Sequence, residues 1–237
     1  MNLISYLPLV SFIISIIFAI VIFLRYLKKR GAHQLLWAIG MLFYSLGGLC
    51  EALYGFFGWN ALVFRLWYLF GAILVAAWLG QGTVYLLARP KIAHILMVIL
   101  FLGSIYAAVR VFTAQLDPSL MTTGVHTGSE LSGHAITTPG VRMLTPFFNL
   151  YGTLTLVGGA IYSAFLFWRK RILLHRALGN LLIAAGAILP AFGGTFSRFG
   201  IVGALYISEL LGAILLFLGF LRAITPMKNE PETETNL

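Results

Sequence analysis

The sequence predicts an all-α membrane protein, a polytopic seven-transmembrane helix bundle. Of its 237 residues, 60% are hydrophobic and only 10% are charged, whereas a soluble domain of this size carries about 25% charged residues. The hydrophobic residues fall in seven blocks, and each is long enough to cross a bilayer, which takes about 20 helical residues. Basic residues gather in alternate connecting segments. We expect one transmembrane domain over 1–223.

Each block predicts one helix, and the connections between the blocks are short except for one. The first block lacks a preceding basic region, so we interpret it as an uncleaved helix rather than a signal peptide. The connection 114–142 is rich in Ser, Thr, Gly and Pro and predicts an outer loop. Residues 224–237 are polar and acidic and predict a disordered cytoplasmic tail. The expected helices span 3–25, 33–57, 61–88, 92–113, 143–168, 175–195 and 200–223.

The distribution of Lys and Arg predicts the orientation in the membrane. Short loops with many basic residues face the cytoplasm. Of the 16 Lys and Arg residues, all but four lie on one predicted side. We therefore expect the N-terminus outside and the C-terminus in the cytoplasm, in a bacterial plasma membrane. The net charge of +9 is accounted for by this bias, so we expect the lipid bilayer as a partner and no nucleic acid.

Cysteine labelling tests this orientation. In a Cys50→Ala background, Ser129→Cys should react with a membrane-impermeant maleimide added outside the cell, because residue 129 lies in the predicted outer loop. Lys29→Cys should stay unlabelled until the membrane is permeabilised, because residue 29 lies in a basic cytoplasmic connection. Labelling at 29 and protection at 129 would reverse the predicted orientation.

The remaining four basic residues, Arg65, Arg110, Arg142 and Arg198, lie on the predicted outer side. One interpretation is that each side chain reaches from a helix end to the lipid headgroups, as long basic side chains do. The alternative is that the arginines together attract an anionic ligand. Their number on the side where basic residues are normally scarce favours the second interpretation.

Glu51 lies about 9 Å below the outer end of the second predicted helix, given a rise of 1.5 Å per residue. The second and third helices are joined through the residues "GWN" and should form an antiparallel hairpin. Reflection about this turn places Glu51 opposite Trp67, within one turn of Arg65. We therefore expect a Glu51–Arg65 ion pair across the hairpin, with either a structural or a functional role.

Glu209 lies about 13 Å below the outer end of the last predicted helix, close to the centre of a core about 30 Å thick. An ionised carboxylate costs about 2.5–3.5 kcal/mol there, so Glu209 should face the bundle interior. It shares a helical face with small residues, and polar residues on other helices occur at similar depths. We expect an outward-facing cavity with Glu209 as its floor, lined by Tyr68, Tyr106, Arg110, Asn149 and Tyr206.

Motifs for other chemistry are scarce. His126, Glu130 and His134 are spaced by four, which on a helix would align metal ligands. Gly128 and Gly133 argue against a helix there, so we interpret the segment as a mobile loop or lid. The sequence has no phosphate-binding loop, nucleophile motif or paired catalytic carboxylates. We expect no enzyme activity, no metal and no cofactor.

Two families offer resemblances. "RYLKKRGAHQLLWAIGMLFYSLGGLCEAL" and "FRLWYLFGAILVAAWLGQGTVYLL" resemble the basic loop, second helix and third helix of the seven-transmembrane sensor region of bacterial histidine kinases. The resemblance covers about residues 20–90 and implies a sensor. No kinase follows the seventh block, so signalling would need a separate partner. The topology also resembles microbial rhodopsins, but the last helix has no lysine to bind retinal.

These observations favour a sensor-like or receptor-like protein with a polar pocket open to the outside, which binds a small anionic ligand or a lipid headgroup. A transporter or proton pathway that uses Glu209 is the first alternative. An accessory subunit of a larger membrane complex is the second. Polar residues are concentrated in the outer half, which favours ligand sensing. The candidate ligand-binding residues are Glu51, Arg65, Tyr68, Tyr106, Arg110, Asn149, Arg198, Tyr206 and Glu209.

Overall fold

The computed structural model describes residues 6–122, 131, 135–170, 174–201 and 203–225. Within these residues the chain is helical and holds seven helices that are long and apolar enough to cross a membrane. This confirms the predicted all-α class and the seven spans. The chain is therefore a multi-pass membrane protein.

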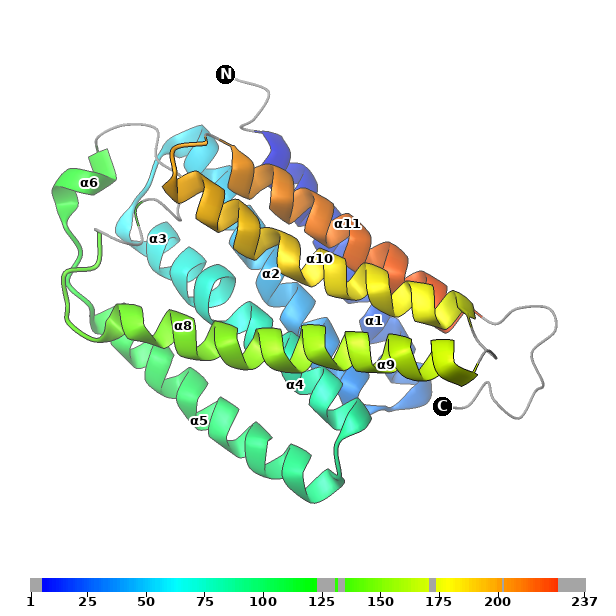
Figure 1. Cartoon of the computed structure of the whole chain (residues 1–237). Coiled ribbons are helices and arrows are strands. Elements are labelled where there is room, and N and C mark those ends of the chain that lie inside the picture. Colours follow the sequence, from blue (N-terminus) through cyan, green and yellow to red (C-terminus); the bar gives the residue numbers. More distant parts are fainter. Residues whose placement is uncertain (1–5, 123–130, 132–134, 171–173, 202, 226–237) are drawn as a thin grey trace.

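Successive spans along the chain run in opposite directions through the bundle (Figure 1). Two of them, the third and the fifth, contain a π-helical segment that divides them into parts. The spans are α1 (Leu7–Lys29), α2 (Ala32–Phe57), α3–η2–α4 (Ala61–Trp67, Tyr68–Leu74, Val75–Leu87), α5 (Pro90–Thr113), α8–η3–α9 (Val141–Gly152, Thr153–Val157, Gly158–Lys170), α10 (Leu174–Arg198) and α11 (Ala204–Ile224).

The helix boundaries differ from the predicted ones by a few residues. α1 continues through the basic residues to Lys29, where Arg30 takes a left-handed conformation and ends it. α5 begins at Pro90, because proline fits the first turn of a helix, where its missing N–H is not needed. The predicted loop 114–142 contains a short helix, α6 (Pro118–Thr122). Residues 226–237 of the predicted tail lie outside the described residues.

The bundle has two chemically different ends. The α6 end holds α6, the first residues of α1 and the segment 135–140 (Figure 1). The opposite end, here called the basic end, carries Lys28, Lys29, Arg30, Arg89 and Lys91. Positive residues normally mark the cytoplasmic side, so the α6 end corresponds to the predicted outer side.

Helices α1, α2, α10 and α11 pack closely on one side of the bundle, and α10 and α11 make the most extensive contact. Small residues allow this approach, as is usual in membrane bundles. A Cβ atom at Gly186 of α10 would lie 2.8 Å from the carbonyl oxygen of Gly212 on α11. Substitution there would force the two helices apart.

α5 lies at the edge of the bundle, and most of its large apolar side chains are exposed to the surroundings. Two hydrogen bonds from the third span hold it in place. Gln81 Nε2 donates to the carbonyl oxygen of Ala93 at 2.9 Å, and Trp78 Nε1 donates to Ser104 Oγ at 3.1 Å. The exposed side chains of α5 therefore suit contact with lipid.

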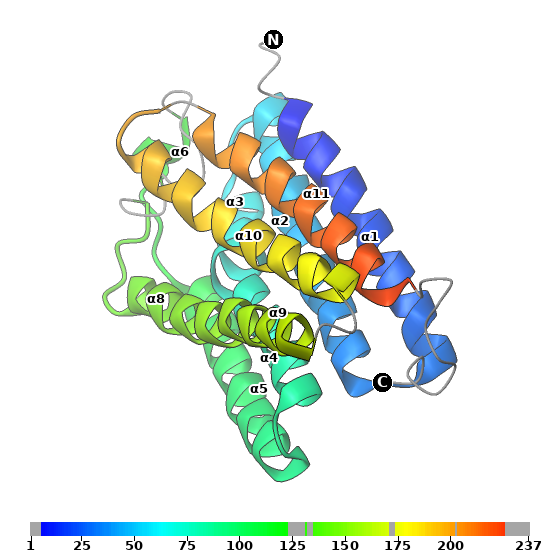
Figure 2. The ribbon, with the colours of Figure 1, turned by 45° about the vertical axis from the view of Figure 1, so that its right-hand side comes forward.

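The position of α10 relative to the fifth span creates space inside the bundle. α10 packs against α9 and η3, and it diverges from α8 toward the α6 end (Figures 1 and 2). Toward the basic end the interior is filled by an apolar cluster, here called the apolar plug. Its buried members are Phe18, Ala19, Ile22, Ala38, Met41, Leu79, Leu156, Leu216 and Phe220.

Candidate functional site

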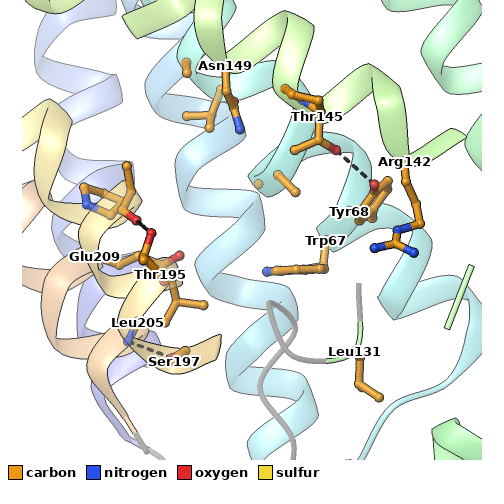
Figure 3. Close-up of a pocket in the computed structure, with 18 of the residues that line it drawn as sticks. Trp67, Tyr68, Leu131, Arg142, Thr145, Asn149, Thr195, Ser197, Leu205 and Glu209 are labelled. Carbon is orange, nitrogen blue, oxygen red and sulfur yellow. Dashed lines mark hydrogen bonds between the residues drawn. The ribbon is translucent and has the colours of Figure 1, made fainter. Parts of the chain in front are cut away.

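A cavity of about 1360 Å³ occupies the space between α8 and α10, as Figure 3 shows from close by. Its walls come from α2, α3, η2, α4, α6, α8, η3, α10 and α11. At the α6 end it is lined by Thr137, Gly140 and Gly200, which are exposed, so the cavity reaches the surface there. At its inner limit it is lined by Leu79 and Leu216 of the apolar plug.

One wall of the cavity is formed by polar residues of α8 and η2. Thr145 Oγ1 donates a hydrogen bond to the hydroxyl of Tyr68 at 2.9 Å. Arg142 and Asn149 lie on the same side as this pair (Figure 3). Neither side chain makes a hydrogen bond or an ion pair with another described residue. Both can therefore donate to a ligand that enters the cavity.

The opposite wall is formed by α10 and α11 and holds Glu209 (Figure 3). The backbone carbonyl of Glu209 accepts a hydrogen bond from the Tyr44 hydroxyl at 2.7 Å, which ties α11 to α2. Thr195 on α10 donates to the carbonyl oxygen of Ala191 at 2.9 Å. Arg142 and Glu209 thus give the cavity a positive side and an acidic side.

Glu51 lies behind the acidic wall, with 1% of its surface exposed. Its Oε1 accepts a hydrogen bond from Trp67 Nε1 at 3.0 Å. Its carboxyl group also lies within hydrogen-bonding reach of the Glu209 carboxyl group. α2 and α11 therefore bring two carboxyl groups together, instead of the predicted ion pair of Glu51 with Arg65.

The predicted Glu51–Arg65 ion pair is wrong. The guanidinium group of Arg65 donates instead to the carbonyl oxygen of Ala114 at 2.9 Å, and Glu51 is paired with Trp67. The depth along the hairpin was predicted correctly, but residues 65 and 67 are separated by about 200° around a helix. Only one of them can face α2.

The structure brings together some of the predicted site residues and separates others. Tyr68, Asn149 and Glu209 line the cavity. Tyr206 is buried on α11 but is not among the lining residues. Arg198 ends α10, and its side chain lies outside the part of the structure that is described.

Tyr106 and Arg110 were predicted to line the cavity, and this prediction is wrong. Both lie on α5, which packs outside η2 and α8 rather than beside α11. Tyr106 is 54% exposed. Arg110 donates to the carbonyl oxygen of Pro139 at 2.8 Å and lies 6.0 Å from the centre of the Tyr106 ring. These residues connect α5 to the segment before α8.

Several wall residues were not among the predicted site residues. Arg142 was noted only as one of four outer arginines, although its position just before a helix with Thr145 and Asn149 on one face could have indicated it. Tyr44 and Thr195 lie on helix faces rich in small residues, a pattern that indicates an interior position, but it did not identify them as wall residues. The segment 136–140 carried no signal in the sequence, because its place in the wall depends on how distant helices pack.

The described residues contain no group of three or more His, Cys, Asp or Glu side chains arranged to hold a metal ion. His126, Glu130 and His134 lie outside the described residues, so the interpretation of that loop stays a prediction. Cys50 is a free, buried cysteine on α2.

No family model, no curated protein and no solved structure matches this chain. The resemblance of residues 20–90 to histidine-kinase sensor regions therefore remains an expectation.

Proposed function

We propose that this protein is a receptor-like or sensor-like membrane protein that binds an anionic ligand in the cavity between α8 and α10. The observation that carries the proposal is the cavity itself, which reaches the surface at the α6 end and has Arg142 in its wall. Ligand sites in proteins are usually concave, mostly apolar and supplied with a few polar groups that orient the ligand. This cavity has that composition.

The cavity is closed toward the basic end, which favours binding over conduction. The apolar plug fills the bundle between the cavity and the basic end with buried Phe, Leu, Ile and Met side chains. A second, smaller hollow of about 50 Å³ lies among those side chains, and its walls are mostly apolar, with Thr83, Ser163 and Asn180 as polar members. An ion or polar solute would lose its hydration in the apolar plug and gain few partners there.

The charge and shape of the cavity favour a ligand with an anionic headgroup and an apolar portion. Arg142 and Asn149 can donate hydrogen bonds to a carboxylate or phosphate, which are the anions that arginine recognises best. Ala76, Leu79 and Leu156 offer apolar surface farther inside. The same headgroup chemistry could come from a soluble anion or from a lipid that enters between α8 and α10.

The role of Arg142 can be tested by native mass spectrometry of the detergent-solubilised protein with two probes, inorganic phosphate and lysophosphatidylglycerol. We expect Arg142→Gln to weaken binding of the effective probe by about ten- to hundredfold, because a hydrogen bond to a charged group contributes about 1.5–3 kcal/mol. Binding of phosphate alone would assign the site to a soluble anion. Binding of the lysolipid alone would assign it to a lipid headgroup.

Arg169→Gln is the matched control. It removes the same charge from an exposed position near the basic end, outside the cavity, and should leave binding unchanged. Equal weakening by both variants would mean that the probes respond to net charge rather than to the cavity. Binding of neither probe to the wild-type protein would contradict the anionic-headgroup proposal.

In this proposal the α6 end faces the outside of a bacterial plasma membrane and the basic end faces the cytoplasm. The signal would pass to a separate signalling or membrane protein through the cytoplasmic ends of the helices. α11 links the two regions, because Glu209 lies in the cavity wall while Leu216 and Phe220 belong to the apolar plug. A ligand that moves α11 would also disturb the plug.

A proton-coupled transporter is the second candidate, and the adjacent carboxyl groups of Glu51 and Glu209 favour it. Acidic residues inside membrane spans often serve as proton relays. A transporter would need a second conformation in which the apolar plug opens. Ligand-dependent proton movement into proteoliposomes would distinguish this function from sensing.

A further inference from the structure

The two carboxyl groups beside the cavity come from helices that are far apart in the sequence. Glu51 lies on α2 and Glu209 on α11, and each carboxyl group is within hydrogen-bonding reach of the other. Glu51 is almost completely buried, whereas Glu209 is partly accessible and lines the cavity. One carboxyl group thus lies inside the bundle and the other at the cavity surface.

No basic side chain among the described residues neutralises this pair. Arg65 donates to the Ala114 carbonyl, and Arg142 lies on the opposite wall of the cavity (Figure 3). α1 carries no charged residue between positions 7 and 24, and α10 carries none between 177 and 197. His33 of α2 and Arg222 of α11 lie at the basic end; the other titratable groups on α2, η2 and α11 are Tyr44, Cys50, Tyr54, Tyr68 and Tyr206.

The hydrogen bonds of Glu51 leave one of its oxygens in need of a donor. Oε1 accepts from Trp67 Nε1. Oε2 is buried and receives no hydrogen bond from an N–H group or a hydroxyl group of another described residue. An ionised carboxylate can only accept hydrogen bonds, whereas a protonated carboxyl group can also donate one. Two adjacent carboxyl groups therefore bind each other only when one of them carries a proton.

We propose that Glu51 and Glu209 form a proton-binding site, in which the two adjacent carboxyl groups share one proton and are hydrogen-bonded to each other through it. The indole N–H of Trp67 satisfies Oε1 of Glu51, which leaves Oε2 for this hydrogen bond. Because Glu209 lines the cavity, the shared proton can pass to water there and return from it. The site takes up and releases one proton through the cavity, which opens at the α6 end of the bundle, whether or not a ligand is bound.

Infrared difference spectroscopy of the reconstituted protein tests this site without any ligand. A protonated carboxyl group has a C=O stretching band that ionised carboxylates lack and that shifts when H₂O is replaced by D₂O. We expect wild-type protein at neutral pH, in potassium buffer, to show such a band and to lose it when the pH is raised. Glu209→Gln and Glu51→Gln should each remove the band, since either change replaces one member of the pair by a neutral amide.

Asp117→Asn is the control. Hydrogen bonds from the side chain and backbone of Ser119 lower the pKa of Asp117, so this exposed carboxyl is ionised at neutral pH and its removal should leave the band intact. The proposal is overturned if wild-type protein lacks the band, or if the band persists in a folded Glu209→Gln or Glu51→Gln variant. A band that is present in potassium but disappears when sodium replaces potassium would support the proton site, because it would mean that sodium competes with the proton for the same carboxyl groups.

Discussion

Gly152→Ala is expected to destabilise the protein strongly. It should lower the melting temperature in detergent and the yield of folded protein. Gly152 ends α8 where the fifth span crosses α4. A Cβ atom there would lie 2.3 Å from the carbonyl carbon of Ala76, 2.5 Å from its oxygen and 2.6 Å from the nitrogen of Ala77. These are backbone atoms, so no side-chain rotation can relieve the clash. Overpacking of this kind costs about 1–3 kcal/mol or more.

Gly158→Ala is the matched control, because Gly158 belongs to the same span and a Cβ atom there would meet nothing within 4 Å. Alanine is also favoured over glycine inside a helix by about 1 kcal/mol, so this variant should be neutral or slightly stabilised. Equal melting temperatures for the two variants would show that α4 and α8 do not approach as closely as described.

The position of each helix along the membrane normal could be predicted from the sequence. A membrane span must satisfy its backbone hydrogen bonds internally and must match the thickness of the hydrocarbon core. Apolar blocks of sufficient length therefore identify the spans, and a constant rise per residue places each side chain in depth. This is why Glu51 was correctly placed at the level of Trp67.

The rotation of each helix and its neighbours could not be predicted in the same way. Arg65 and Trp67 lie at nearly the same depth, but packing against α2 and α5 decides which of them meets Glu51. Tyr106 has suitable polarity and depth for the cavity, yet α5 lies at the edge of the bundle. The two π-helical segments, η2 and η3, also shift the helical register of the residues that follow them in α4 and α9, and such segments often mark functional sites.

One feature of the candidate site could be predicted from the free-energy cost of placing a charged side chain in lipid. That cost indicated that Glu209 should face inward, and the structure places it in the cavity wall. The approach of Glu51 to Glu209 depends instead on contact between the second and last spans, for which the sequence has no local signal. The same holds for the divergence of α8 and α10 that opens the cavity.

Filling the cavity should abolish ligand binding. In Ala191→Trp an indole replaces a methyl group on α10, at a position that lines the cavity and is exposed to it. We expect no detectable binding of the probe that wild-type protein retains, phosphate or lysophosphatidylglycerol, by native mass spectrometry. The melting temperature without ligand should stay close to that of the wild type, because the indole enters existing space and displaces no packed side chain.

Phe192→Trp separates this effect from a general response to tryptophan. Phe192 is the next residue on α10, is 55% exposed and is not among the cavity-lining residues, so its replacement should leave binding as it is in the wild type. Lipid that merely coats the outside of the bundle would bind both variants equally, and that result would contradict a site between α8 and α10. Loss of binding in Ala191→Trp alone, with stability retained, would place the ligand inside the bundle, in the part of the cavity that lies between α10 and Arg142.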